Sequence, residues 1–403
     1  MLQPIDVKPP DSRAEPQRLF DLQAARRWEL ARSTAPERRE RLRRLKAALE
    51  RHRAALAEES GATSVAPPTS RSSSRSTPRS RRSTTPSPTS AEWMRSEPVG
   101  TPVMLADTAS EIRWEPKGQV LILAPWNYPV FLVLGPLADA VAAGNTVILK
   151  PSEKVPETNR ALRQILTDAF PEAEVAMVEG DASVAEALLA LPFNHILFTG
   201  STKVGKLVMA AAAKTLASVT LELGGKSPAY VAPGANLERA ARAIAWGSSS
   251  TPARPASPRL RAGPGGAARG AGGRAPRIDG GQLRSRGGWA RNGDLARLVD
   301  PGAFARVKGL LDEALQRGAR VAFGGTTDAG QRFIAPHGAG RRAAGCGHPQ
   351  EEIFGPVLPV VTYRTEAEAR WRTCAAARSR WRSIRSGRAP RPAPPSPGPP
   401  RAG

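Results

Sequence analysis

GQVLILAPWNYP at residues 118–129 opens the stretch that decides the fold, and it is followed by GNTVILKPSE (144–153), HILFTGSTKVGK (195–206) and SVTLELGGKSP (218–228). Each segment carries a short apolar run rich in Val, Ile and Leu, and roughly helix-length segments separate the runs. Short continuous apolar runs of this kind are typical of parallel strands buried on both faces. Residues 118–232 therefore predict a series of βαβ units around a parallel sheet.

Sharp turns rich in Gly, Pro and Asn follow these apolar runs. Residues 125–129 end the first strand, residues 150–153 end the second, and residues 199–205 open a helix after the strand at 194–198. Doubly wound sheets bind their ligands at the carboxyl ends of the strands. The turns are therefore the predicted ligand-contacting positions.

The same turns carry a family resemblance. Five motifs resemble, in this order, those of NAD(P)-dependent aldehyde dehydrogenases: PWNYP, KPSE, FTGSTKVG, LELGGKSP and, much later, EEIFGPV. Their sequences are most similar to the class 3 and the coniferyl or fatty aldehyde branch of this family. The resemblance covers residues 17–368 with interruptions. It implies oxidation of an aldehyde to a carboxylic acid with NAD or NADP. It also implies a Rossmann-like cofactor domain, a second α/β catalytic domain and a homodimer formed through strand pairing.

Composition narrows the class of protein. No stretch of eighteen apolar residues occurs, and the N-terminus lacks an apolar signal core, so a cytoplasmic protein without a membrane segment is expected. Two cysteines, Cys346 and Cys374, do not suggest a disulfide framework, and four scattered histidines argue against a metal site.

The formal charge of +23 is confined to four segments. Residues 61–90, 248–291, 337–349 and 369–403 together hold 25 Arg and one Asp, and the rest of the chain is close to neutral. All four are rich in Arg, Ser, Pro, Ala and Gly and lack hydrophobic periodicity, which predicts disorder.

The domain organisation follows from these boundaries. Residues 17–58 have apolar positions at helical spacing and predict a pair of helices before the sheet, with a coiled coil as the alternative. We expect N-terminal helices in 1–60, disorder in 61–90, an NAD(P)-binding Rossmann-like domain in 91–222, a catalytic domain in 223–368 interrupted at 248–291 and 337–349, and a disordered tail in 369–403.

The chemistry implied by the resemblance needs a cysteine thiolate. The thiolate attacks the aldehyde, the adduct gives up hydride to the nicotinamide, and the remaining thioester is hydrolysed. The motif that carries this cysteine is expected soon after LELGGKSP, yet the first cysteine of the chain is Cys346. The nucleophile is missing, and Ala256 stands at its expected position.

A change of reading frame accounts for the missing motif. Residues 247–259 read GSSSTPARPASPR; one choice of synonymous codons, with a single A inserted after the first codon, translates as GKFLNAGQTCVAP. That segment is similar to the family's nucleophile segment, and its cysteine codon spans those of Pro255 and Ala256. We interpret all four basic segments as frameshifted translation. Disordered basic insertions are the alternative, although an insertion would add residues without replacing the motif.

The resemblance assigns two of the remaining residues to catalysis. Glu222 in LELGGKSP matches the general base that activates the hydrolytic water, and a carboxylate at a buried strand end has a pKa open to an upward shift. Asn127 in PWNYP matches the side-chain amide that donates to the developing oxyanion. Without the resemblance, Glu222 is only a strand-end glutamate and Asn127 a turn residue.

The other motifs are assigned to the cofactor. Lys150 and Glu153 match the pair that holds the adenosine ribose hydroxyls, and NAD versus NADP stays open because a lysine also accommodates a 2′-phosphate. GSTKVG opens a helix whose N-terminal amides can face a pyrophosphate. Glu352 and Phe354 match contacts to the nicotinamide ribose and ring. The alternative for Lys150 and Glu153 is a solvated loop, and the alternative for Glu352 and Phe354 is an ordinary strand start. The predicted cofactor-binding residues are Trp126, Lys150, Glu153, Gly200, Ser201, Thr202, Lys203, Val204, Gly205, Glu352 and Phe354.

Two other functions remain open beside aldehyde oxidation. One is a nucleotide-binding pseudoenzyme without catalysis, which saturable NAD binding without turnover would favour. The other is a nucleic-acid-associating protein that uses the Arg-rich segments, whose binding would weaken steeply with salt. The segments lack Lys and interleaved aromatic residues, which argues against nucleic acid as a partner.

Overall fold

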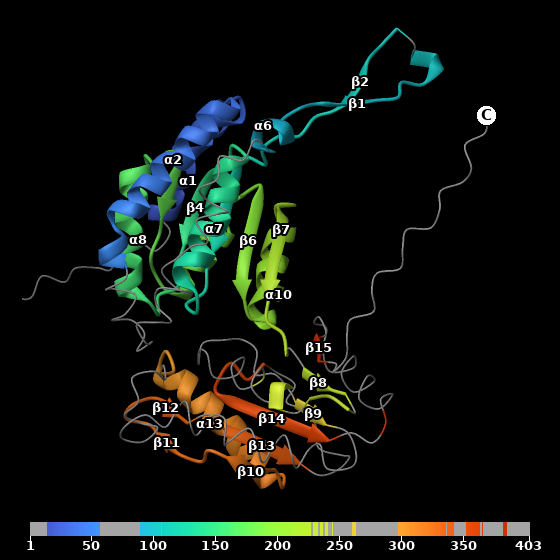
Figure 1. The fold of residues 1–403 in the computed structure, drawn as a ribbon. Helices are drawn as coiled ribbons and strands as arrows, with labels where there is room; N and C mark the ends of the chain where they lie inside the picture. Colours follow the sequence, from blue (N-terminus) through green and yellow to red (C-terminus); the bar gives the residue numbers. More distant parts are fainter. Residues whose placement is uncertain are drawn as a thin grey trace, which may run out of the picture.

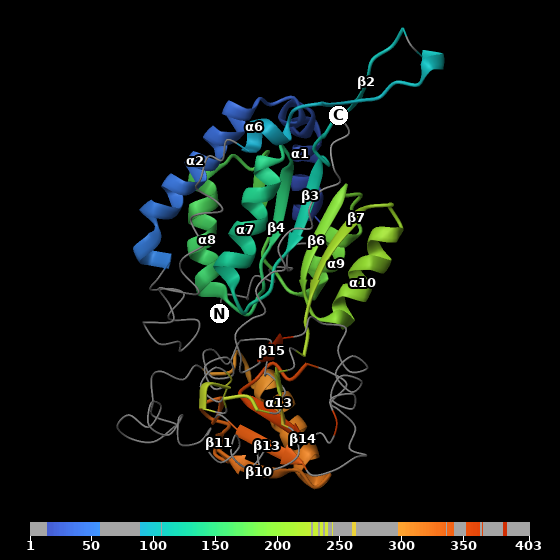
Figure 2. The ribbon, with the colours of Figure 1, turned by 45° about the vertical axis from the view of Figure 1, so that its right-hand side comes forward.

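The computed structural model consists of two bodies, seen from two directions in Figure 1 and Figure 2. The first contains helices α1 to α10 and a parallel sheet, and the second contains α13 and a mixed sheet. The residues that the structure describes are 14–56, 89–105, 107–226, 229–232, 234–236, 238–240, 244, 260–262, 297–335, 337–341, 352–362, 365 and 382–384.

A five-stranded parallel sheet forms the centre of the first body. Its strand order, β5-β4-β3-β6-β7, means that the chain starts in the middle, runs to one edge and then returns to build the other side. Strands β3 and β4 are buried along their whole length, which explains their continuous apolar sequence. The predicted βαβ series is confirmed, and the structure adds the short β5. The strands are β3 Gln119–Leu123, β4 Thr146–Lys150, β5 Val175–Met177, β6 His195–Gly200 and β7 Ser218–Leu223.

Each connecting helix has a start signal that can be read from the sequence. α7 and α8 have a proline in their first turn, where a backbone N–H is not needed for the helix. α9 and α10 are capped by the side chains of Asp181 and Ser201, which accept backbone N–H groups of the first turn. The helices are α7 Pro129–Ala142, α8 Pro156–Ala169, α9 Ala182–Leu189 and α10 Thr202–Ala213.

Two N-terminal helices, α1 Ala14–Ala31 and α2 Ala35–Arg51, cover the sheet body. Thr34 and Glu37 form a capping box at the start of α2, and Pro36 lies in the first turn of the helix. Leu45 and Ala48 of α2 join the core formed by α7, α8 and one face of the sheet, and Leu19 of α1 joins the core on the other face. The predicted helix pair is confirmed, and the coiled-coil alternative is wrong because the apolar stripes pack on the sheet body.

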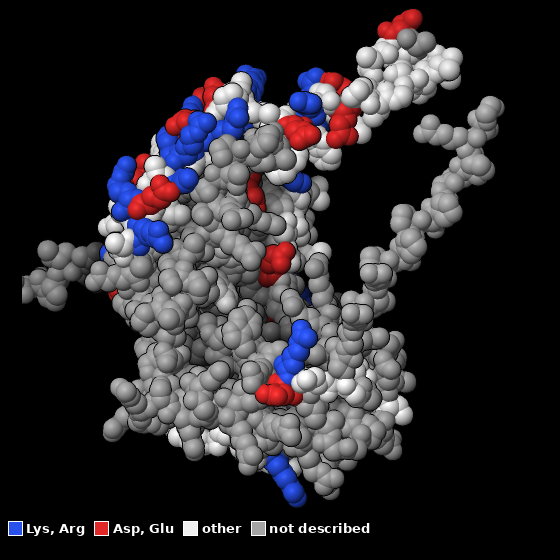
Figure 3. All heavy atoms as spheres, in the orientation of Figure 1, with Lys and Arg blue, Asp and Glu red and all other residues white. Residues whose placement is uncertain are grey.

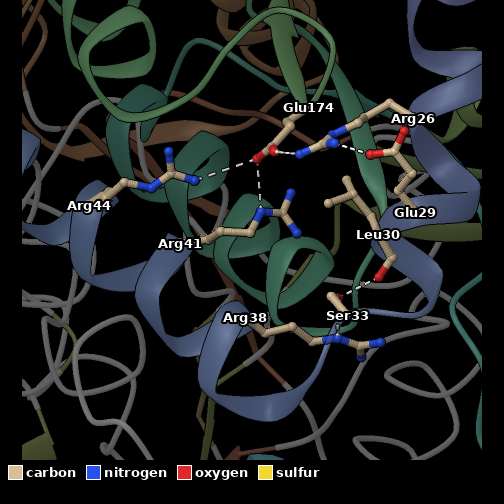
Figure 4. A network of polar contacts seen from close by, with 8 residues as sticks. All are labelled: Arg26, Glu29, Leu30, Ser33, Arg38, Arg41, Arg44 and Glu174. Carbon is tan, nitrogen blue, oxygen red and sulfur yellow. Dashed lines mark hydrogen bonds and ion pairs between the residues drawn. The ribbon is translucent and has the colours of Figure 1, made fainter.

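A buried carboxylate ties these helices to the sheet (Figure 4). Glu174, which directly precedes β5, accepts hydrogen bonds from Arg26 of α1 at 2.8 Å and from Arg41 of α2 at 2.9 Å. Arg44 lies 3.6 Å from the same carboxylate. The side chains of Glu174 and Arg41 are only 5% and 6% exposed, so this pair is shielded from water.

A hairpin arm projects from the first body, as Figure 1 and Figure 2 both show. It follows the short helix α6 Thr89–Trp93 and consists of the antiparallel strands β1 Glu97–Val99 and β2 Ser110–Ile112, joined by the 3₁₀ helix η2 Val103–Leu105. The side chains of Val103 and Met104 at its tip are more than nine-tenths exposed. The sequence predicts the strand near 110–114 and an extended crossing at 98–102, but not that the two pair.

The second body contains a six-stranded sheet with the order β10-β13-β14-β9-β8-β15 and a helix, α13 Pro301–Gln316. The helix buries Val307 and Leu311 of its predicted apolar stripe. A small hairpin of β11 Thr327–Asp328 and β12 Phe333–Ile334 lies beside it. The sheet strands are β8 Ala229–Val231, β9 Leu260–Ala262, β10 Arg320–Phe323, β13 His337–Arg341, β14 Val357–Thr362 and β15 Arg382–Ile384.

Three of these strands lie in segments for which composition predicts disorder. β9 falls within 248–291, β13 within 337–349 and β15 within 369–403. β13 and β9 flank β14 in parallel register, and β15 pairs with β8. The predicted disorder does not extend to these strands, because backbone pairing needs no side-chain periodicity. The remainder of the basic segments, with residues 57–88, lies outside the described residues.

Candidate functional site

The predicted turns meet at one edge of the parallel sheet. Leu123 at the end of β3 is paired in register with Lys150 of β4 and with Phe198 of β6, and Thr199 is paired with Glu222 of β7. The carboxyl ends of four strands therefore lie side by side, and Figure 1 shows the arrowhead of β6 pointing toward the second body. This edge is where the switch in strand order occurs, between β3 and β6.

The PWNYP turn lies directly after β3. Asn127 is buried, with 8% of its surface exposed, and Trp126 is half-buried. The ring of Trp126 meets the ring of Phe354 edge-to-face, with centroids 5.1 Å apart. Because Phe354 belongs to the second body, this contact brings two predicted cofactor residues together across the gap between the bodies.

Lys150 and Glu153 form the pair expected from the KPSE motif. Lys150 Nζ lies 3.5 Å from Glu153 Oε2 and donates to the carbonyl of Pro151 at 3.3 Å. The lysine side chain is 7% exposed and the glutamate 48%, so the carboxylate stays open to a ligand. Asn159 donates to the carbonyl of Ser152 at 2.9 Å, which fixes the turn on the following helix.

The GSTKVG segment forms the first turn of α10. Ser201 is the N-cap, and its side chain accepts the N–H of Val204 at 3.3 Å. Ser201, Thr202, Lys203 and Val204 are exposed, and this first turn directly follows the carboxyl end of β6, where the first backbone N–H groups of a helix are free to bind an anion. Gly205 is buried, and a Cβ there would lie 2.7 Å from Leu223 Cδ2, so the small residue permits helix and strand to approach.

Glu222 differs from the sequence prediction in one respect. The prediction places this carboxylate at a buried strand end, whereas the structure shows an exposed side chain. The expectation is wrong because β7 is the edge strand of its sheet, and its last two residues have no neighbouring strand on one side. Its predicted role as general base stays a prediction.

Glu352 brings a carboxylate from the second body to the glycine turn after β7. The N–H of Gly225 donates to this carboxylate. A Cβ at Gly224 would lie 1.9 Å from Glu352 Oε2, so only glycine permits this approach. Burial raises the pKa of Glu352 to about 7, opposed by the Gly225 N–H and by the charge of Arg306. Glu352 Oε1 is buried and has no hydrogen-bond partner among the described residues.

The position of the missing nucleophile, Ala256, lies outside the described residues, as do Cys346 and Cys374. Within the described part of the chain, no group of three or more His, Cys, Asp or Glu side chains could hold a metal ion. No described helix is long and apolar enough to cross a membrane.

Two sets of contacts around the site cannot be predicted from the sequence, one between the two bodies and one within the second body. Lys154 of the KPSE loop forms an ion pair at 2.6 Å with Asp300, which also caps α13. Arg306 of α13 holds the backbone of the EEIFGPV segment. An Asp before a Pro-initiated helix is a recognisable cap signal, but nothing in the sequence reveals its distant partner.

Comparison with known proteins decides the family. The sequence profile of the aldehyde dehydrogenase family matches residues 20–252 and 282–373, which is most of the chain. The chain belongs to the aldehyde dehydrogenase family. The stretch left unmatched, 253–281, falls within the basic segment 248–291, and the match ends close to the start of the basic tail.

Individual aldehyde dehydrogenases also match this chain in sequence and in fold. Aldehyde dehydrogenase family 3 member B2 of Mus musculus is 38% identical over 290 residues, which are 69% of this chain and 57% of that protein. The dimeric NADP-preferring aldehyde dehydrogenase of Rattus norvegicus is 38% identical over 287 residues, 69% of this chain and 60% of that protein. A structure of an indole-3-acetaldehyde dehydrogenase with NAD⁺ has a TM-score of 0.76 at 26% identity, covering 89% of this chain and 74% of that one.

The relatives confirm the predicted resemblance to the class 3 branch, since a family 3 member is among them. The structural neighbour confirms the two-part α/β fold class. The chain spans about three fifths of the length of the curated relatives that it matches.

Proposed function

We propose that the gene behind this chain encodes an enzyme that oxidises an aldehyde to a carboxylic acid with NAD or NADP, and that the chain as written retains the cofactor site without the nucleophile. The observation that carries the proposal is the convergence of the Lys150–Glu153 pair, the α10 N-terminus and Glu352 on one sheet edge. Relatives that prefer NADP or have been solved with NAD⁺ support a nicotinamide cofactor.

The residues at this edge fit such a cofactor. Glu153 and Lys150 would hold the adenosine ribose hydroxyls, and the exposed first turn of α10 would hold the pyrophosphate. Glu352 Oε1, which has no partner among the described residues, can accept a ribose hydroxyl, and the Trp126–Phe354 pair offers an apolar surface to the nicotinamide. When bound, the cofactor would supply a hydride acceptor.

The chain's own residues supply part of the remaining chemistry. The buried side-chain amide of Asn127 would donate to an oxyanion that develops at the aldehyde oxygen. Glu222 is the second-last residue of β7 and its side chain is exposed, so it can reach a water molecule and take its proton. Both residues act on a thiol adduct, so neither can produce turnover without the cysteine.

Frameshifted translation would account for the missing cysteine. The stretch that the family profile leaves unmatched, 253–281, overlaps the end of segment 247–259, for which one choice of codons reads GKFLNAGQTCVAP in another frame. On this interpretation the chain as written is a nucleotide-binding pseudoenzyme, and the frame-corrected chain is an ordinary aldehyde dehydrogenase.

We also propose that the folded chain forms a homodimer. α10 exposes Leu207 and Met209, with 63% and 58% of their surfaces accessible, and the projecting hairpin arm exposes further apolar side chains. These exposed apolar side chains are candidate contacts between two copies of the chain. A rat relative named as dimeric supports the proposal.

The nucleic-acid alternative has less support. On the face drawn in Figure 3, the described basic side chains of α2 are interleaved with acidic ones. Arg43 pairs with Glu40 at 2.8 Å, and Lys46 lies 3.8 Å from Glu50. Interleaved charges of opposite sign give no basic stripe for a phosphate backbone on the described part of this face.

A titration of the purified chain with NAD and with NADP tests the proposal, followed by an assay for reduced nicotinamide with a set of aldehydes. We expect saturable binding of one cofactor and no turnover, and turnover in a chain translated from the frame-corrected gene. Absence of binding to both cofactors would contradict the cofactor site. An inactive but folded and cofactor-bound corrected chain would contradict the proposed activity.

A further inference from the structure

The short segment 352–355 carries both predicted cofactor contacts of the second body, and it lies against α13. Ile353 is buried in the same core as Val307 and Leu311 of that helix. A Cβ at Gly355 would lie 2.8 Å from a methyl group of Val307, so the segment and the helix touch backbone to side chain. The segment is therefore held on α13 rather than on a sheet strand, since β14 begins only at Val357.

Phe354 adopts a backbone conformation that an L residue rarely takes. Its φ is +49°, in the left-handed region, and this turn directs its ring onto Trp126 of the first body. A non-glycine residue keeps such a conformation only when its surroundings fix it. The surroundings must therefore hold the backbone next to Phe354.

Arg306 supplies that restraint. Its guanidinium donates from one terminal nitrogen to the carbonyl of Glu352 at 3.2 Å and from the other to the carbonyl of Ile353 at 2.5 Å. The fork of an arginine fixes both the position and the direction of two acceptors at once. These are the two carbonyls that directly precede Phe354.

We propose that Arg306 is a positioning residue for cofactor binding, because it fixes the backbone that aims Glu352 at the glycine turn and Phe354 at Trp126. This inference rests on the proposed function. Arg306 also faces the Glu352 carboxyl with its charge and favours the ionised form, which accepts a hydroxyl hydrogen bond more strongly. The other group acting on this carboxyl is the backbone N–H of Gly225.

The test compares cofactor affinity of Arg306→Ala, Arg306→Gln and the unaltered chain as a function of pH. Hydrogen bonds with a charged partner predict a loss of affinity of about 10- to 100-fold in Arg306→Ala. Affinity of the unaltered chain should rise as pH increases through about 7, where Glu352 ionises. Both variants should move this midpoint to higher pH, because they remove the cation.

Arg317→Ala is the matched control, since Arg317 lies at the C-terminal end of α13 and pairs only at the surface with Glu313. Arg306→Gln keeps a hydrogen-bond donor group but removes the charge. It therefore tests the inference even if Arg306→Ala fails to fold. Unchanged affinity and an unchanged midpoint in both Arg306 variants would overturn the inference and leave the cofactor site standing. Absence of binding in the unaltered chain would overturn both.

Discussion

Replacing Glu174 by Gln should loosen the N-terminal helices from the sheet. The substitution keeps the size of the side chain but removes the charge that balances Arg26 and Arg41. The two terminal nitrogens of Arg41 are buried and already have no hydrogen-bond partner among the described residues. The guanidinium would then be left in the interior without a counter-ion.

The size of the effect follows from the burial of the pair. Side-chain exposures of 5% and 6% place Glu174 and Arg41 among buried ion pairs, for which removing one partner costs about 3–5 kcal/mol. If α1 and α2 open as a unit, this loss accelerates amide exchange in both helices by roughly 10²- to 4 × 10³-fold. Hydrogen exchange read by mass spectrometry measures it directly.

Glu172→Gln is the matched control because Glu172 lies two residues away and pairs with Arg18 at 3.1 Å on the surface, with 61% of its side chain exposed. Exposed pairs contribute little, so exchange in α1 and α2 should stay unchanged. A change below about 1 kcal/mol in Glu174→Gln would refute the reasoning, since that is the range of surface pairs.

The pH dependence of stability tests the same ion pair independently. Burial raises the pKa of Glu174, but the hydrogen bonds and charges of Arg26 and Arg41 prevail, and the pKa lies below its ordinary value near 4.5. A depressed carboxyl pKa stabilises the fold above the unfolded pKa and loses this contribution as pH falls through the folded pKa. The difference between the unaltered chain and Glu174→Gln should therefore shrink below pH 4.5.

Three further predictions follow from the site. In thermal unfolding, Gly309→Ala, in open space on α13, should stabilise by about 1 kcal/mol, and Gly205→Ala should stabilise less, because its methyl group would lie 2.7 Å from Leu223 Cδ2 and displace that side chain. Lys150→Ala should weaken cofactor binding in a titration by about tenfold with unchanged circular dichroism, as expected for a lost charged hydrogen bond. Ala256→Cys alone should show no aldehyde oxidation, since the residues around the nucleophile are also replaced.

The parallel sheet could be predicted because a short stretch of sequence specifies each of its elements. The apolar runs of β3 and β4 and the prolines at the start of α7 and α8 each specify one element, and the βαβ pattern orders them. The short β5 and the pairing of the hairpin arm escaped prediction, since three residues give little periodicity. β9, β13 and β15 escaped for a different reason, because neighbouring strands impose the pairing on them.

The candidate site was predictable only as separate motifs. The resemblance points to Lys150 and Glu352 individually, but their meeting at one sheet edge depends on strand register and on contacts between the two bodies. The exposure of Glu222 was missed because sequence does not reveal which strand lies at the edge of the sheet. Arg306 was missed because its partners are backbone carbonyls, which leave no trace in the sequence.

The nucleotide sequence across the codons for residues 247–291 distinguishes frameshifted translation from genuine basic insertions. We expect that the alternate frame, reached by one inserted base after the codon for Gly247, reads GKFLNAGQTC and continues as family-like sequence. If neither alternate frame encodes a cysteine-bearing segment of this kind, frameshifted translation is contradicted, and the basic segments are genuine parts of a chain that never carried the nucleophile.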